Sequence, residues 1–235
     1  MGGAVRGGII AAGEGSRLRR DGFTAPKPLV EVAGVPLIGA VLRNFEAAGV
    51  TSITIIVNED ERECVEWVRA HRPALDVDFI VKTTASSLES FREVTGRGPA
   101  GPMLVSTVDA WCAPEDFANF AAEAARRPDD ATVLAVTPFV SDEKPLWVTL
   151  GADGRVTGLG DARGGLVTAG VYRVSDRARR IEPMPALGRL REYLGWLLTQ
   201  GEPMYGAIIE TVVDVDRRED VASAEALAGK RVGRA

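Results

Sequence analysis

Histidine is almost absent from this chain, and cysteine is scarce. The 235 residues include one histidine, His71, and two cysteines, Cys64 and Cys112. A single histidine excludes a histidine-based metal cluster and any catalytic triad that needs a second histidine. We expect His71 on the surface at a helix end. One cysteine lies in a predicted helix and the other just after a predicted strand, so we expect reduced thiols.

The chain also lacks an excess of basic charge and a long apolar run. Its net charge is −5, and no long basic block occurs, which argues against a nucleic-acid partner because such binding depends on clustered cations. No stretch approaches the roughly 20 apolar residues of a membrane span, and the start lacks the pattern of a secretion signal. We therefore expect a cytoplasmic protein, with no nucleic acid and no membrane among its partners.

What the chain does contain is an ordinary globular composition, 46% hydrophobic and 26% charged, and a repeated alternation of strand and helix patterns. This alternation favours an α/β fold, a three-layer sandwich around a doubly wound, mostly parallel sheet. Residues 152–154 predict a hairpin turn and thus a small antiparallel region. No linker or internal repeat interrupts the pattern, so we expect residues 1–235 to form a single domain.

Apolar periodicity and capping residues give the predicted elements. Ser86 and Glu89 have the spacing of a capping box at a helix start. The predicted strands span residues 5–11, 52–57, 77–81, 103–108 and 131–137. The predicted helices span residues 36–48, 62–70, 114–127 and 217–228. Further regular segments span residues 165–173, 187–199, 203–209 and 211–215.

The most informative stretch is the first thirty residues. The apolar strand 5–11 leads into a loop with Gly13 and Gly15, whose missing side chains let backbone N–H groups approach an anion. Arg17 and Lys27 add positive charge, and prolines on both sides of Lys27 stiffen its backbone. The alternative for Lys27 is a surface lysine in a turn. The Walker pattern is excluded because no lysine follows the second glycine, and the dinucleotide fingerprint because leucine replaces its third glycine.

Asp109 directly follows the predicted strand 103–108. In a doubly wound sheet, ligands bind at the carboxyl ends of the strands, which gives a polar residue at this point functional weight. A helix cap or turn residue before Pro114 is the alternative interpretation. A hard divalent cation is usually held by one or two carboxylates together with substrate phosphates, so a metal site here calls for a second aspartate.

Three segments resemble the nucleotidyltransferases that act on sugar 1-phosphates and phosphocholine, within the MobA-like NTP transferase superfamily. Residues 8–18 read GIIAAGEGSRL and match Ala-Ala-Gly-x-Gly-Ser/Thr-Arg-Leu. Residues 25–38 contain Pro-Lys-Pro-Leu, then a glycine and Pro-Leu-Ile. Residues 214–225 read DVDRREDVASAE, similar to the ending Asp-x-Asp-x-x-Glu-Asp-x-x-x-Ala-Glu. The resemblance implies the Rossmann-like fold of these enzymes, which is similar to that of GT-A glycosyltransferases.

The resemblance implies transfer of a nucleoside monophosphate from a nucleoside triphosphate to a small phosphorylated acceptor, with release of pyrophosphate. The acceptor is expected to be a sugar 1-phosphate or an alcohol phosphate such as phosphocholine. Mg²⁺ is the implied cofactor, held by Asp109 and Asp214. Arg17 is expected at the pyrophosphate side and Lys27 at the reacting phosphates, so Arg17, Lys27 and Asp109 are the expected catalytic residues.

The resemblance also implies contacts to the substrates. The base is expected on the backbone where the first strand ends, residues 83–88 near the base and ribose, and residues 166–172 beside the acceptor. Gly170 is expected to let the substrate approach the backbone. The residues expected to bind substrate are Ala11, Ala12, Gly13, Gly15, Ser16, Thr84, Ser87, Thr168 and Gly170.

Other parts of the chain depart from the family pattern. Asp216 has Glu219 three residues on, which favours a cap of the final helix over a metal ligand. Residues 143–145 read Glu-Lys-Pro, a motif that contacts sugar phosphate in one branch of the family, but here they precede the hairpin, and we interpret them as an exposed loop. Residues 20–24 replace a spacer that usually contains proline. Residues 84–88 replace the Gly-Thr-Ala-Gly loop of the thymidylyl and uridylyl branches.

Three other functions stay open as alternatives. They are a nucleotidyltransferase for the molybdenum cofactor, a nucleotide-binding regulatory module without catalysis, and a glycosyltransferase. The last needs an Asp-x-Asp after its strand, where this chain has Trp111. The base, the acceptor and the oligomeric state are not predicted.

Overall fold

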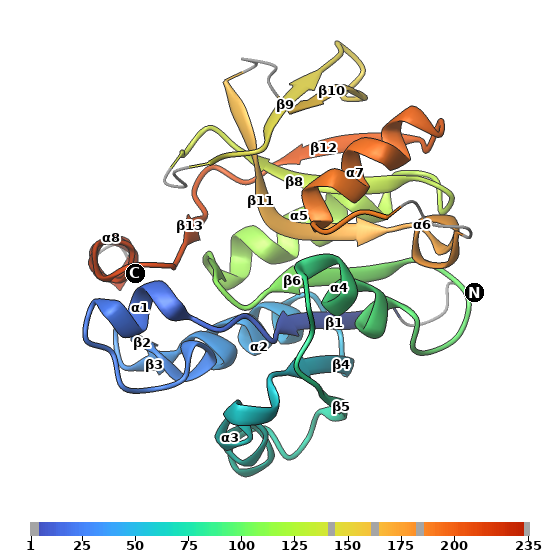
Figure 1. Cartoon of the computed structure of the whole chain (residues 1–235). Helices are drawn as coiled ribbons and strands as arrows, with labels where there is room; N and C mark the ends of the chain where they lie inside the picture. The colour runs from blue at the N-terminus through green and yellow to red at the C-terminus, as the bar shows by residue number, and fades with distance from the viewer. Residues whose placement is uncertain (1–4, 141–143, 161–164, 182–185, 233–235) are drawn as a thin grey trace.

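Nine strands form one large central sheet in the computed structural model, which describes residues 5–140, 144–160, 165–181 and 186–232. Their order along the sheet is β10-β9-β11-β6-β1-β4-β5, and β8 joins β11 to β12 (Figure 1). The strands are β1 (Arg6–Ala11), β4 (Ser52–Val57), β5 (Asp76–Val81), β6 (Met103–Thr107), β8 (Thr132–Thr137), β9 (Trp147–Leu150), β10 (Val156–Gly160), β11 (Leu166–Val174) and β12 (Met204–Ile208).

Most of the sheet is parallel, as the alternation of strands and helices predicts. β1 runs parallel to β4 and β6, β4 to β5, and β12 to β8. The exceptions are β10, which is antiparallel to β9, and β11, which is antiparallel to β6, β8 and β9 and shifts register against β8 between Thr168 and Tyr172. The predicted hairpin is present, because β9 and β10 pair antiparallel around a turn with Gly154 at φ 78°.

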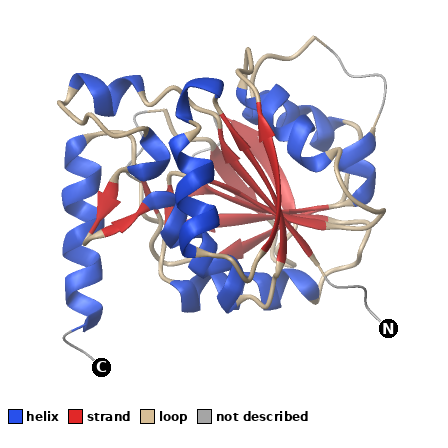
Figure 2. Cartoon of the chain, turned by 90° about the horizontal axis from the view of Figure 1, so that it is seen from below, coloured by secondary structure: helices blue, strands red, loops and turns tan. Residues whose placement is uncertain are grey.

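Helices cover both faces of the sheet, which confirms the three layers (Figure 2). Successive strand residues point to opposite faces, so Ile9 joins one buried apolar cluster and Ile10 the other. One cluster includes residues from α2 (Leu37–Ala47), α3 (Glu63–His71) and α5 (Pro114–Ala125). The other includes residues from α4 (Ser87–Thr95), α6 (Asp176–Arg180) and α7 (Leu190–Thr199).

Two glycines let helices approach β1 from both sides. A Cβ at Gly7 would lie 2.8 Å from the Phe45 ring of α2, and one at Gly8 would lie 2.5 Å from Val94 Cγ1 of α4. The strand is therefore packed tightly on both faces, and its carboxyl end has a fixed place in the middle of the sheet.

Capping residues define where the helices begin. Ser86 accepts a hydrogen bond from the Glu89 backbone N–H at the start of α4, as its spacing predicts, and Pro114 is the first residue of α5. His71 ends α3 on the surface, where its ring stacks on Trp67 at a centroid distance of 4.4 Å. No helix within the described ranges is long and apolar enough to cross a membrane.

The C-terminal segment returns to the carboxyl ends of β1 and β6. Within it, β13 (Val213–Asp214) pairs with β7 (Ala110–Trp111), and α8 (Arg218–Val232) lies near α1 (Ser16–Arg20) and the small hairpin of β2 (Glu31–Val32) and β3 (Val35–Pro36) (Figure 1). Arg218 N–H donates to Asp21 Oδ2 at 3.0 Å, and its guanidinium lies over the Phe23 ring. The unusual spacer 20–24 thus joins the first helix to the last one.

Candidate active site

Asp109 stands where the strands β1 and β6 end side by side. The two strands are parallel, with Ile10 opposite Thr107, and the Val108 backbone N–H donates to Ile10 O at 3.0 Å. The glycine loop after β1 and Asp109 after β6 therefore meet at one edge of the sheet, as the sequence predicts.

The glycine loop is built around a left-handed residue. Gly15 has φ 61° and caps α1, and a Cβ at this position would lie 2.7 Å from Lys27 Cβ. Glycine is thus required both by the backbone conformation and by the close approach of Lys27. Ala11 and Ala12 are buried at the strand end, whereas Gly13 is exposed and a Cβ there would meet nothing within 4 Å.

Lys27 lies inside the site rather than on the surface. It begins the short 3-10 turn η1 (Lys27–Leu29), and its side chain is only 7% exposed. Its Nζ donates to Asp109 Oδ2 at 2.5 Å and to Asp216 Oδ1. Arg17 Nη1 donates to Asp216 Oδ2 at 2.6 Å. One aspartate therefore connects the two cations that the first thirty residues contribute.

The charges of this cluster stabilise one another. Burial by itself lowers the pKa of the Lys27 ammonium, but Asp109, Asp216 and Asp214 outweigh burial and raise it above its ordinary value. Burial likewise tends to raise the pKa of the Asp109 carboxyl, yet Lys27 and a hydrogen bond from Thr107 hold that pKa below its ordinary value. The lysine is thus fully protonated and the aspartate ionised near neutral pH.

Asp109, Asp214 and Asp216 form a cluster of three carboxylates. One oxygen from each lies within 4.8 Å of the others, because β13 places Asp214 opposite Ala110 and Val215 N–H donates to Asp109 O at 3.0 Å. Three carboxylate oxygens at this spacing suit a hard divalent cation such as Mg²⁺.

The predicted role of Asp216 as a helix cap is wrong. Helix α8 begins at Arg218, and the carboxylate of Asp216 faces Lys27 and Arg17 instead. The backbone N–H groups of Asp216 and Arg217 are capped by Asp220 Oδ2, at 3.0 and 2.8 Å. The spacing in the sequence predicts that Asp216 caps the helix. In the fold, Asp220 accepts from the backbone N–H groups before α8, and the Asp216 carboxylate belongs to the cluster.

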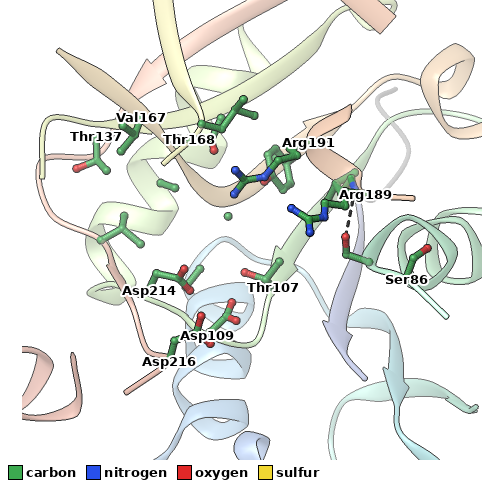
Figure 3. A pocket seen from close by; sticks show the side chains of 18 of the residues that line it. Ser86, Thr107, Asp109, Thr137, Val167, Thr168, Arg189, Arg191, Asp214 and Asp216 are labelled. Carbon is green, nitrogen blue, oxygen red and sulfur yellow. Dashed lines mark hydrogen bonds between the residues drawn. The ribbon is translucent and has the colours of Figure 1, made fainter. Parts of the chain in front are cut away.

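A cavity of about 620 Å³ opens beside the cluster. Figure 3 shows Asp109, Asp214 and Asp216 on one side of it, and Arg189 and Arg191 across from them. Thr137, Val167 and Thr168 line a further part of the wall. The cavity thus has an acidic wall beside the glycine loop and a basic wall at the start of α7.

The cavity includes some of the predicted substrate residues and leaves out others. Arg17, Ser87, Thr168 and Gly170 line it. Thr84 is not part of the lining, and its hydroxyl is hydrogen-bonded to Ser90 Oγ at 2.6 Å. The lining does not include Ala11, Ala12, Gly13, Gly15 and Ser16, which run from the end of β1 to the first residue of α1, directly before the lining residue Arg17 in the chain.

Gly170, which lines the cavity, also has a packing reason to be glycine. Its φ is 70°, and a Cβ would lie 2.7 Å from Thr107 Oγ1 and 3.0 Å from Ala110 Cβ. Glycine therefore lets β11 approach the end of β6 closely. Residue 143 of the Glu-Lys-Pro motif lies outside the described residues, and Lys144 is exposed, as expected of this loop.

Sequence reasoning missed Arg189 and Arg191, and it placed Tyr172 in the segment beside the acceptor without giving this residue a role. Arg191 Nη1 donates to Lys144 O at 2.8 Å, and the Leu190 N–H donates to Ser87 Oγ at 3.1 Å, so the start of α7 is held against the loop at Lys144 and the start of α4. Burial raises the pKa of Tyr172, Asp109 and Asp214 raise it further, and Arg191 opposes them. The sequence shows these arginines only as a pair two residues apart at a helix start. That pattern does not indicate a binding site, and only the fold places both side chains at the cavity.

Comparisons with known proteins agree with this geometry. The MobA-like NTP transferase domain family matches residues 7–153, more than half of the chain. A CMP-5'-(3-aminopropyl)phosphonate synthase of Streptomyces rubellomurinus is 28% identical over 200 residues, covering 79% of this chain and 31% of that protein. A mannose-1-phosphate guanyltransferase of Yarrowia lipolytica is 30% identical over 137 residues, covering 56% of this chain and 37% of its own length. The chain thus spans about a third of the length of these curated relatives.

The fold is also that of solved nucleotidyltransferases. The inositol-1-phosphate CTP transferase from T. maritima superposes with a TM-score of 0.81, at 17% identity, over 96% of this chain and 97% of that one. At this identity the similarity concerns the fold alone.

Proposed function

The chain belongs to the MobA-like NTP transferase family, and we propose that it transfers a nucleoside monophosphate from a nucleoside triphosphate to a small phosphorylated acceptor, releasing pyrophosphate. The observation that carries this proposal is the cluster at the ends of β1 and β6, where Lys27 and Arg17 meet Asp109 and Asp216 beside a glycine loop. Such a site can hold polyanions and a divalent cation next to one another.

The transfer is an in-line displacement at the α-phosphorus. An oxygen of the acceptor phosphate forms the new P–O bond, and the bond between the α-phosphorus and the bridging oxygen to the β-phosphate breaks, so that pyrophosphate leaves with the electron pair. The acceptor oxygen is already ionised, so no side chain has to remove a proton. This fits a cavity whose lining contains no histidine among the described residues.

The nucleotide side of the site positions the triphosphate. The exposed backbone at Gly13 and the turn at Gly15 leave room for phosphate oxygens, and Arg17 and Lys27 neutralise the charge that develops at the pyrophosphate and the α-phosphate. Burial makes the Lys27 ammonium effective, because a charge in a site with little water interacts strongly with a phosphate. The base is expected against the backbone of Ala11 and Ala12.

Asp109 and Asp214 would hold Mg²⁺, with Asp216 beside them. When bound, the ion supplies Lewis-acid stabilisation of the phosphate oxygens. The residues of this chain provide the oxygen donors and fix their spacing through the pairing of β13 with β7.

The acceptor would occupy the part of the cavity between the acidic cluster and α7. Arg189 and Arg191 are the cations of that wall, and a guanidinium binds a phosphorus oxyanion with two parallel hydrogen bonds. Thr168 offers a hydroxyl nearby. The names of the two curated relatives include a sugar 1-phosphate and a phosphonate, and both carry such an oxyanion. We propose an acceptor of this class, a sugar 1-phosphate or an alcohol phosphate.

A pyrophosphate-release assay with CTP, UTP, GTP, ATP and dTTP tests the proposal. Each nucleotide is combined with a panel of sugar 1-phosphates and alcohol phosphates, with and without Mg²⁺. We expect one nucleotide to support release that depends on both acceptor and Mg²⁺. Binding of a nucleotide without turnover on any acceptor would indicate a regulatory module, and release that needs no acceptor would contradict the transfer. Thermal-shift measurements with the same nucleotides come first and identify the preferred base. A ligand at about 100 times its Kd raises the free energy of unfolding by about 2.7 kcal/mol.

A further inference from the structure

The two cations of the nucleotide side are already occupied by one carboxylate. Asp216 Oδ1 accepts from Lys27 Nζ, and its Oδ2 accepts from Arg17 Nη1 at 2.6 Å. The exposed fractions of the side chains are 38% for Arg17, 28% for Asp216 and 7% for Lys27. Asp216 thus bridges the outer cation to the inner one at the rim of the cavity that it helps to line.

The backbone holds Asp216 in this position from both sides. Asp220 caps the N–H groups of residues 216 and 217, and Val215 N–H is bonded to the Asp109 carbonyl. Further along, Arg218 is bound to Asp21 through its N–H and its guanidinium. Because these contacts fix the backbone on both sides of Asp216, they also fix the direction in which its carboxylate faces the two cations.

A triphosphate needs the same two cations. Asp216 accepts one N–H from each of them and neutralises part of their charge, so the phosphate oxygens engage both cations fully only when they displace this carboxylate. The released carboxylate would then face Asp109 and Asp214, whose oxygens lie within 4.8 Å, and three adjacent negative charges are unfavourable without a counter-ion. A divalent cation removes this cost.

We propose that Asp216 is a positioning residue that acts through Arg17 and Lys27: its carboxylate holds both cations in place before the triphosphate binds, and makes triphosphate binding depend on a divalent cation. The inference rests on the proposed nucleotidyl transfer, and it concerns binding rather than the chemical step.

The test measures nucleotide affinity by calorimetry, with Mg²⁺ and with chelator, on the preferred nucleotide. Asp216→Asn should bind the metal-free nucleotide about tenfold more tightly than the unchanged protein, because a partly buried ion pair no longer competes, and its gain from Mg²⁺ should shrink by a similar factor. Asp216→Glu, which restores the charge, should restore the dependence on Mg²⁺. Circular dichroism and thermal melting verify that the variants fold.

Two controls separate the ion pairs from a general effect of charge. Glu14→Gln removes one negative charge from the glycine loop, where Glu14 is exposed. It should change the logarithm of the metal-free nucleotide affinity by less than half the change that Asp216→Asn causes. In an Arg17→Ala background, the gain from Asp216→Asn should fall by at least half. An unchanged affinity of Asp216→Asn, an equal gain in Glu14→Gln, or an undiminished gain without Arg17 would each overturn the inference alone. A protein that binds no nucleotide even with Mg²⁺ would overturn the proposed function and the inference with it.

Discussion

Two walls of the cavity hold their cations in different ways. The nucleotide wall consists of Arg17 and the three clustered aspartates, with Lys27 bound to them, and the acceptor wall of Thr168, Arg189 and Arg191. On the nucleotide wall, Lys27 and Arg17 are bound by carboxylates, which are themselves fixed by the pairing of β13 with β7. On the acceptor wall, Arg191 is bound by a backbone carbonyl of a loop. A charge held by a carboxylate is neutralised in the free protein, whereas a carbonyl only orients it. The comparison indicates a nucleotide wall that its carboxylates assemble in advance, and an acceptor wall in which a main-chain carbonyl orients the Arg191 guanidinium.

Asp109→Asn breaks the nucleotide wall and has the largest expected effect. The substitution removes the carboxylate that pairs with Lys27 and that would hold Mg²⁺, so turnover should fall about 10³-fold. Lys27 keeps its contact to Asp216, and thermal melting should show an intact fold. Steady-state pyrophosphate release measures the effect. A variant that retains more than a tenth of the activity would place the metal and the reacting phosphates elsewhere.

Glu61→Gln tests a buried carboxyl group that interacts electrostatically with Lys27 of the nucleotide wall. Glu61 ends the 3-10 turn η2 (Glu59–Glu61) and is 4% exposed, and its Oε2 has no hydrogen-bond partner within the described part of the chain. Burial raises its pKa from 4.5 to about 7, which Arg19 and Lys27 partly oppose. Because the folded state holds the proton more tightly, this contribution to stability is full below the unfolded pKa and is lost as pH rises through the folded one.

The unchanged protein should therefore lose up to about 3 kcal/mol of unfolding free energy between pH 4.5 and 7 from this group, and the glutamine variant should not. Urea titrations at pH 5 and pH 8 measure the difference. We expect Glu61→Gln to be the more stable protein at pH 8. Parallel pH profiles of the two proteins would show that Glu61 ionises normally in the fold.

The same contrast explains what the sequence could predict. The nucleotide wall comes mainly from residues 11–29, a contiguous motif whose glycines, arginine and lysine are visible as a string, and Asp109 is marked by the apolar strand before it. The acceptor wall comes from β11 and the start of α7, which α6 separates in the chain. Its geometry depends on the reversal of β11 and on a register shift at Thr168, and neither leaves a local pattern.

Asp216 shows a second limit of sequence reasoning. Its local spacing fits a helix cap, but its contacts lie 189 and 199 residues away in the chain, at Lys27 and Arg17. A capping preference of about 1 kcal/mol is easily outweighed by two charge-assisted hydrogen bonds, and Asp220 takes over the cap. The local pattern thus singles out Asp216 but predicts the wrong partners for it, the helix N-terminus instead of Lys27 and Arg17.

Arg191→Ala and Arg189→Ala break the acceptor wall and should leave the nucleotide wall intact. Each variant should raise KM for the acceptor by about 10- to 100-fold, because a charge-assisted hydrogen bond to a phosphate contributes roughly 1.5 to 3 kcal/mol, while KM for the nucleotide stays within twofold. Arg126→Ala, on an exposed arginine at the end of α5, is the matched control and should change neither. A rise in the nucleotide KM instead would move these arginines to the triphosphate.

Gly15 and Gly13 have different roles in the loop beside the nucleotide wall, and their substitutions have the smallest expected effects. Gly15→Ala forces alanine to φ 61° and its Cβ to 2.7 Å from Lys27 Cβ, so unfolding free energy should fall by about 1 to 3 kcal/mol. Gly13→Ala meets nothing within 4 Å and should leave stability within about 0.5 kcal/mol, yet raise KM for the nucleotide several-fold, because its methyl group enters the space meant for phosphate oxygens. Urea denaturation and steady-state kinetics on both variants separate a glycine that shapes the loop from one that leaves room for the ligand. Equal losses of stability would show that both serve the backbone alone.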